Sequence, residues 1–338
     1  MLKGKQSWVF PKRPAIVSTG VTGGPFEAKG KLAEDFDILH EDLTMGKQSF
    51  EKAHCLLLEE AIEIAIEKGE AKKEDIQFMI AGDLINQITP SSFAARKMEI
   101  PYFGIFGACS TSMEGLALAS FIINYGGAKK VVTAASSHNA AVEKQFRYPT
   151  EYGGQKPPTA QWTVTGAGAA VVTENSGQKG LPVTTSATIG KVIDMGLSDP
   201  FNMGGAMAPA AADTILAHFN DMDLDPSYYD LIVTGDLGKI GQETTYELLK
   251  NAGLALEREA FKDCGLMIYK EDQPVQSGGS GAGCSATVVY GHLINEMKRG
   301  TYKKILMVAT GALLSPLSFQ QKETIPCVAH AVAIEIQD

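Results

Sequence analysis

The hydrophobic residues along the chain follow two periods. Short runs rich in Val, Ile and Ala predict β-strands, and longer runs with apolar residues at every third or fourth position predict helices. The predicted strands are residues 15–18, 76–81, 102–106, 130–135, 167–173, 187–195, 231–234, 304–310 and 331–336. The predicted helices are residues 49–68, 110–125, 207–219 and 284–298. Because strands alternate with amphipathic helices, the pattern predicts an α/β protein in which helices pack on sheets.

The same succession of elements occurs twice. Residues 75–84 (DIQFMIAGDL) are similar to residues 228–237 (YYDLIVTGDL). Further along each copy, a cysteine, Cys109 or Cys284, precedes a predicted helix, which is followed by Lys-Lys and a strand. Two matches in the same order predict that one β-α-β design is used twice. We expect an N-terminal half of residues 1–178 and a C-terminal half of residues 179–338.

A long irregular segment, residues 137–165, separates two predicted strands of the first half. The corresponding segment of the second half, residues 313–324, is shorter. Loops of this length in a compact domain usually form a lid, a binding loop or a subunit contact. We therefore expect the functional asymmetry between the halves around the first-half loop.

Composition narrows the possible functions. The chain has 338 residues, of which 44% are hydrophobic, enough for a large core, and its formal net charge of −9 disfavours a nucleic-acid partner. Five cysteines without a CxxC pair indicate a reducing compartment rather than a disulfide framework, and no cofactor or metal site is expected. No apolar run is long enough to span a membrane, and no secretory signal is present. We expect a protein made in soluble form in the cytoplasm.

Cys109 is the first candidate for chemistry. It follows the predicted strand 102–106 and lies at the start of the predicted helix 110–125. A helix N-terminus offers free backbone N–H groups and a positive dipole, which favour a thiolate and bind anions. The alternative is an ordinary buried cysteine, which is common for this residue type. Cys284, at the matching corner, follows the glycine-rich segment 277–283, which favours close helix packing over chemistry.

These features resemble the thiolase superfamily, which includes the ketoacyl-acyl-carrier-protein synthases. Longer segments resemble the stage V sporulation protein AD family of spore-forming bacteria; they are residues 106–114, 136–139, 145–157, 206–213 and 309–316. The resemblance implies a five-layered α/β/α/β/α fold built from two similar halves, and a homodimer. In such a dimer we expect the strand 130–135 to pair across the two-fold axis.

The chain departs from the enzymes of this superfamily at their histidine positions. Condensing enzymes that use a cysteine need a base and oxyanion donors beside it. After the strand 231–234, where a ketoacyl synthase has histidine, this chain has Gly235-Asp236-Leu237, and no histidine lies between His218 and His292. Cys327 alone matches the second cysteine of thiolases. We therefore expect a non-catalytic site in which Cys109 and Cys327 are relics of catalytic positions.

The family resemblance implies binding of dipicolinic acid (pyridine-2,6-dicarboxylate) and its movement into or out of the spore. It also implies membrane proteins of the same sporulation system as partners, and peripheral association with the spore inner membrane. A calcium ion is a possible companion of the ligand. Asp83 could hold a water, hold that calcium or cap a helix, and we favour the cap. The expected ligand-binding residues are Asp83, Cys109, Ser110, Ser136, Ser137, His138 and Arg147.

Two other interpretations remain open at this point. The chain could be an active acyltransferase in which Cys109 takes the acyl group and His138, His330 or Cys327 serves as base. It could instead be a docking platform that contacts membrane subunits through residues 137–165. His54 and His218 lie on predicted helix faces and are expected to be solvated or packing residues, and Cys327-x-x-His330 has too few ligands for a zinc site.

Overall fold

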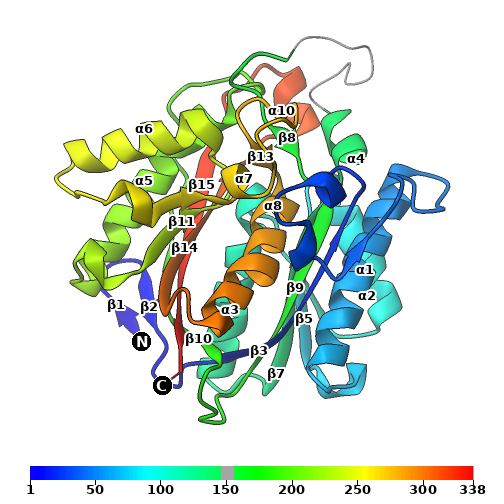
Figure 1. The fold of residues 1–338 in the computed structure, drawn as a ribbon, viewed down its shortest axis with the longest axis vertical. Coiled ribbons are helices and arrows are strands. Elements are labelled where there is room, and N and C mark those ends of the chain that lie inside the picture. Colours follow the sequence, from blue (N-terminus) through cyan, green and yellow to red (C-terminus); the bar gives the residue numbers. More distant parts are fainter. Residues whose placement is uncertain (146–155, 338) are drawn as a thin grey trace.

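The computed structural model describes residues 1–145 and 156–337, and it is built in five layers (Figure 1). Two sets of strands are separated by α3 and α8, while α1 and α2 cover one outer face and α5 and α6 cover the other (Figure 1). Three large clusters of buried apolar side chains lie between the layers, one around the central helices and one under each outer pair of helices. The five-layered α/β fold expected from the sequence is confirmed.

The first half contains β3 (Ala15–Gly23), α1 (Phe50–Lys68), β5 (Phe78–Gly82), α2 (Thr89–Met98), β6 (Tyr102–Gly104), α3 (Thr111–Asn124), β7 (Lys130–Ser137), α4 (Asn139–Glu143), β8 (Trp162–Thr163) and β9 (Gly166–Thr173). The second half contains β10 (Pro182–Ile189), α5 (Met203–Met222), β11 (Leu231–Thr234), α6 (Gly238–Asn251), β12 (Phe261–Asp263), α7 (Cys264–Met267), β13 (Gly279–Ser280), α8 (Ala282–Thr287), α9 (Ile294–Arg299), β14 (Lys304–Ala312), α10 (Pro316–Gln320) and β15 (Cys327–Ile336). Short strands β1 (Leu2–Lys3), β2 (Ser7–Val9) and β4 (Ile38–Leu39) complete the main sheet.

The strand order shows the duplication directly. It runs β12-β11-β14-β15-β10-β3-β9-β7-β5-β6, so that the second-half order mirrors the first. In each half, the three outer strands pair in parallel and the next two pairings are antiparallel, so that only β9 and β15 run against the other strands of their halves. In the main sheet the halves join where β10 pairs with β3, with Val183 opposite Ala15, and with β2, with Ala187 opposite Trp8. The carboxyl ends of β5 and β11, where an α/β sheet commonly places its ligand groups, therefore carry equivalent segments.

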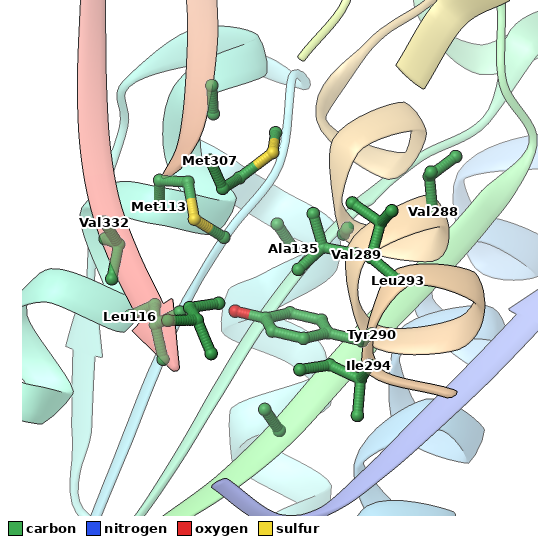
Figure 2. Close-up of a cluster of buried hydrophobic side chains, with 14 of the residues drawn as sticks. Met113, Leu116, Ala135, Val288, Val289, Tyr290, Leu293, Ile294, Met307 and Val332 are labelled. Atoms are coloured by element: carbon green, nitrogen blue, oxygen red, sulfur yellow. The ribbon is translucent and has the colours of Figure 1, made fainter. Parts of the chain in front are cut away.

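The middle layer is the apolar centre of the molecule. Figure 2 shows the ring of Tyr290 between Leu116 of α3 and Ile294 of α9, with Met113, Met307 and Val332 on neighbouring elements. Tyr290 is fully buried, and its hydroxyl donates to the backbone oxygen of Ser112 over 3.3 Å. This satisfied contact links the two central helices and fixes the start of α3, immediately after Cys109.

Two sequence expectations need correction. The strand predicted over residues 187–195 is β10, which spans Pro182–Ile189; residues after it form a loop that bridges Ile193 to Cys327. The strand predicted to pair across a dimer axis, β7, cannot do so, because β5 and β9 already occupy both its edges. In the part of the chain that the structure describes, the outer strand of this half is β6, which pairs only with β5.

Further findings concern the helices and the two long loops. Helices α2 and α6 were not predicted, because their sequences are polar or begin with Thr-Pro-Ser-Ser. The long loop 137–165 contains α4 and β8 among its described residues, and the shorter loop 313–324 contains α10. No helix among residues 1–145 and 156–337 is long and apolar enough to cross a membrane.

Candidate functional site

Cys109 lies in a strained corner between β6 and α3. The preceding residue, Ala108, has φ of 50°, a left-handed conformation that is uncommon for a residue with a side chain. Such strain costs about 1–3 kcal/mol and clusters at functional sites. Close by, a Cβ at Gly311 of β14 would stand 2.2 Å from the Gly107 oxygen, so the corner requires glycine there. Both halves of the chain thus shape the turn that holds the cysteine.

The space beside Cys109 is small. The cavity has a volume of about 20 Å³, room for about one water molecule. Its lining comes from both halves and includes Phe106, Val142, Met203, Ser280 and Leu314. A larger open groove of about 630 Å³ lies elsewhere, between α1 and α2. A ligand larger than water can enter the Cys109 corner only if its lining moves.

A buried carboxylate, Asp236, lies near Cys109. Three donors reach this carboxylate: the hydroxyl of Thr310 over 2.8 Å, the hydroxyl of Ser280 over 3.0 Å and the Gly281 N–H over 2.9 Å. Burial raises the pKa of Asp236, while these hydrogen bonds and the nearby Cys109 thiol oppose the rise. Asp236 is therefore a buried acid near Cys109 that the fold satisfies with three hydrogen bonds.

The surroundings of this pair are acidic. Asp263 accepts from the Thr234 hydroxyl and from the Leu237 and Gly238 N–H groups. Burial raises the pKa of Asp263 to about 7, and the nearby Asp236 adds to the rise. Among the described residues, no lysine, arginine or histidine makes an ion pair with either carboxylate.

The predicted ligand-binding serines all make hydrogen bonds within the fold. The Ser110 hydroxyl donates to the Gly107 oxygen over 2.6 Å. Ser136 lies 2.9 Å from Nε2 of His54. Ser137 donates to the Val164 oxygen over 2.7 Å and accepts from the Gly283 N–H over 3.0 Å. Their role as ligand donors stays a prediction, and ligand binding would require them to exchange these partners.

His138 caps α4 and does not reach Cys109 with any hydrogen bond that the structure shows. Its Nδ1 accepts from the Ala141 N–H over 3.4 Å, and its Nε2 lies 2.8 Å from the Leu43 oxygen. Burial lowers the pKa of His138 to about 4, and the same effect lowers the pKa of His54 to about 4. Both rings are therefore neutral near pH 7, so His138 offers no positive charge to an anion there.

Asp83 caps a helix, as the sequence led us to favour. Its carboxylate accepts from the Ile85 N–H over 2.8 Å, the Ser91 N–H over 2.9 Å and the Ser91 hydroxyl over 2.5 Å. Burial raises its pKa to about 6. These contacts fix the start of α2 and leave its place in a ligand site untested. Arg147 lies outside the described residues.

The remaining candidates from the sequence occupy structural positions. Cys327 is fully buried, its thiol donates to the Ile325 oxygen over 3.4 Å, and burial raises its pKa to about 12. His330 accepts from the Gly190 N–H over 3.3 Å. His218 is a buried packing residue that bonds to Thr188 and Tyr229. Neither His330 nor Cys327 makes a described contact that would let it act as a base for Cys109.

The comparisons with known proteins agree along the whole chain. The family model described as Stage V sporulation protein AD (SpoVAD) matches residues 4–335. The chain is 48% identical over 334 residues to Stage V sporulation protein AD of Bacillus subtilis (strain 168), covering 99% of this chain and 98% of that protein. It belongs to the stage V sporulation protein AD family. The resemblance expected from the sequence is thus confirmed, and the chain is a sporulation protein with a thiolase-like fold.

Solved structures confirm the fold alone. The 3-oxoacyl-acyl-carrier-protein synthase III from Aquifex aeolicus VF5 matches with a TM-score of 0.57 at 15% identity, covering 95% of this chain and 99% of that one. OleA from Xanthomonas campestris matches with a TM-score of 0.61 at 13% identity, covering 96% and 99%. At such low identity the match carries the architecture and not the chemistry of these proteins.

Asp236 is the site residue that sequence reasoning missed. The Gly235-Asp236-Leu237 segment stands where a ketoacyl synthase has histidine, so we read it only as an absence. The structure shows that Asp236 of this segment lies near Cys109. The available signal was the acidic residue in the segment where the resemblance implies a histidine.

Proposed function

We propose that this protein binds dipicolinic acid at the Cys109 corner and takes part in its passage into or out of the spore, without catalysing a reaction on it. Membership of the whole chain in the stage V sporulation protein AD family carries the proposal. The corner adds physical support, because α3 directs its first backbone N–H groups and its dipole toward the space beside Cys109. A small planar dianion suits such a position once the cavity opens.

Binding of a dianion beside Cys109 depends on the charge of the surrounding groups. Asp236 and Asp263 would repel a dianion, and the described residues around Cys109 supply no compensating ion pair to these acids. Either a cation accompanies the ligand, or a basic side chain such as Arg147 pairs with a ligand carboxylate. Calcium is the natural accompanying ion, because it prefers carboxylate oxygens. We therefore propose that calcium strengthens binding.

The non-catalytic part of the proposal rests on the residues that could serve as a base. His138 and His330 bond to backbone groups, and both have a pKa lowered to about 4 by burial. Asp236, which lies near Cys109, belongs to the segment where the resemblance to ketoacyl synthases implies a histidine. Acyl transfer from a thioester needs an activated thiolate and oxyanion donors. The described contacts around Cys109 lack the neutral imidazole that would accept its proton.

The partners are proposed on the same basis. We infer a homodimer through the outer edge of β6, where Phe103 is half exposed, and peripheral association with the spore inner membrane through membrane proteins of the same sporulation system. A docking platform whose cavity has no ligand is the main alternative. It would be favoured if variants at Cys109 and Arg147 kept partner binding and spore dipicolinate content unchanged.

Calorimetric titration tests the proposed function. Dipicolinate would be titrated into wild type, Cys109→Ala and Arg147→Ala, with and without calcium, and acetyl-CoA would be titrated in parallel. We expect saturable dipicolinate binding that both variants weaken and no binding of acetyl-CoA. Cys55→Ala, a change on α1 away from the corner, is the matched control and should bind as wild type does. Acylation of Cys109 by acetyl-CoA, with no dipicolinate binding, would establish the acyltransferase instead.

A further inference from the structure

A second cavity, of about 200 Å³, lies beside two of the elements that line the Cys109 corner. Helix α4 contributes Asn139 to this cavity and Val142 to the cavity at Cys109. Strand β8 contributes Trp162 to this cavity and Thr163 to the other. Because neighbouring residues of a strand point to opposite faces, α4 and β8, which pack against each other, form a wall between the two cavities.

The second cavity has aromatic walls and room for a ring. Its lining includes Phe26, Lys29, Asn139, Trp162 and Thr165, and we call it the aromatic cavity. The rings of Phe26 and Trp162 stack with their centroids 4.5 Å apart. An apolar cavity of about 150 Å³ is enough to bind benzene. The aromatic cavity, at about 200 Å³, therefore has room for a six-membered ring, and the cavity of about 20 Å³ at the corner does not.

Two hydrogen-bond donors of the aromatic cavity have no acceptor within residues 1–145 and 156–337. Nε1 of Trp162 is buried without a hydrogen-bond partner. Lys29 is exposed and makes no ion pair in this part of the chain. Buried polar groups in folded proteins are almost always paired, so an unpaired indole N–H indicates a position that a bound acceptor fills. Ammonium and N–H groups both bind the oxygen of an anion well.

The acidic groups beside the aromatic cavity do not cancel this preference. Glu143 forms an ion pair with Lys156 over 2.7 Å. Glu27 is fully buried and accepts from the Thr165 N–H and the Tyr269 hydroxyl. Burial raises the pKa of Glu27 to about 7, so this group carries only part of a charge at neutral pH.

We propose that the aromatic cavity is a second binding site, which takes a planar aromatic carboxylate with its ring against Phe26 and Trp162 and its carboxylate at Lys29. The inference rests on the proposed function only for the choice of dipicolinate as a probe. A ligand held here touches α4 and β8, the wall that also lines the small cavity at Cys109. The aromatic cavity is thus an anion site next to the corner and separate from it.

Tryptophan fluorescence tests this inference. The chain has two tryptophans, Trp8 and Trp162, so Trp8→Phe leaves Trp162 as the only one. This variant would be titrated with dipicolinate, with isophthalate and with cyclohexane-1,3-dicarboxylate, which has the same charge but no flat ring. We expect saturable quenching by the two aromatic probes, after correction for their absorption, and none by the third. Emission that none of the probes changes would overturn the inference. If Trp8→Phe does not fold, the difference between wild type and Trp162→Phe gives the same signal.

Two lysine variants test the anion contact. Lys29→Met in the Trp8→Phe protein should weaken binding of both aromatic probes about tenfold, because it removes one charge-assisted hydrogen bond. Lys31→Met loses the same charge at an exposed position that does not line the cavity, so it should bind as its parent does. Equal affinities of all three proteins would contradict the assigned role of Lys29.

Cys109→Ala separates the two sites. Quenching of Trp162 should persist in this variant, whereas the calorimetric binding at the corner should weaken. Quenching that is lost in Cys109→Ala and kept in Lys29→Met would show that Trp162 senses the corner alone, and would overturn the second site. Calorimetric binding without quenching would refute this inference and leave the proposed function in place. Quenching together with binding heats that Cys109→Ala does not change would support the aromatic cavity and contradict the corner.

Discussion

Cys109 and Cys284 lie at the starts of the central helices of the two halves, but the strand ends beside them carry different residues. At the Cys284 corner, Ser137 at the end of β7 accepts the Gly283 N–H. At the Cys109 corner the equivalent end of β14 is Gly311, whose missing side chain lets the Gly107 turn approach. The Cys284 corner holds this hydrogen bond beside a fully buried cysteine, whereas the Cys109 corner has a water-sized cavity beside a strained turn. The two halves therefore share one fold, and differences such as Gly311 in place of a serine distinguish the Cys109 corner as the candidate site.

The largest expected effect is at Gly311. Gly311→Ala places a Cβ 2.2 Å from the Gly107 oxygen and 3.1 Å from the Ser110 nitrogen, both of which are backbone atoms that cannot turn aside. We expect a loss of about 3 kcal/mol in the free energy of unfolding, typical of severe overpacking. Urea unfolding measures it. A loss below about 0.5 kcal/mol would show that the corner tolerates a side chain and that its glycine is not what distinguishes it.

The pH dependence of the unfolding free energy tests the environment of Asp83. Because the folded-state pKa of Asp83 is about 6, above the ordinary value of 3.8, its contribution to stability is highest below pH 4 and falls as pH rises to 6. The unfolding free energy of Asp83→Asn relative to wild type should therefore rise across this window, by up to about 3 kcal/mol. Thermal or urea unfolding at pH 4, 5, 6 and 7 measures it. A difference independent of pH would contradict the assigned environment of Asp83.

Replacing Ser137 should lower the unfolding free energy by less than the changes at Gly311 and Asp83. Ser137→Ala leaves the buried Val164 oxygen and Gly283 N–H each without a partner. Unsatisfied buried groups of this kind destabilise by about 1–3 kcal/mol, and we expect a value near the lower end because the alanine adds no clash. The measurement is urea unfolding beside Ser136→Ala, whose hydroxyl bonds only to His54 in the described structure. Equal stability of wild type and Ser137→Ala would mean that the corner does not depend on this bond.

The smallest effect is at Cys109 itself. Cys109→Ser keeps a hydrogen-bond donor near Asp236 and should change the unfolding free energy by less than about 0.5 kcal/mol, whereas Cys109→Ala removes the donor and should lose about 1 kcal/mol. Calorimetric unfolding of the two variants side by side measures the difference. If serine destabilises as much as alanine, packing and not a polar interaction with Asp236 holds the thiol.

The sequence predicted most of the frame because strong periodicity and repetition leave few alternatives. Strand β11 was predicted with its observed bounds, and α1 and α3 within a residue or two. Polar helices such as α6 were missed because the face that α6 buries consists mainly of small and polar residues, Gly238, Gly241 and Thr245, with only one large apolar residue, Leu249. The dimer strand was assigned wrongly because β7 is apolar in both settings, and only the sheet order shows that both its edges are occupied.

The candidate site was less predictable. Position along the chain located Cys109 and its helix, but Asp236 lies far from it in sequence and reaches it only through the pairing of the two halves. Ser110, Ser137 and His138 were reasonable donors by type, yet their hydroxyl and ring atoms bond to backbone groups that no spacing reveals. Residue type shows which hydrogen bonds a side chain can make, but only the fold shows which partners it already has.

A crystal structure of the protein with dipicolinate and calcium tests the central claim most directly. The account predicts the ligand at the N-terminus of α3 beside Cys109, in a cavity enlarged from its present volume of about 20 Å³, with no covalent bond to the thiol. Ligand in the groove between α1 and α2 with the Cys109 corner unchanged, or an adduct on Cys109, would contradict it.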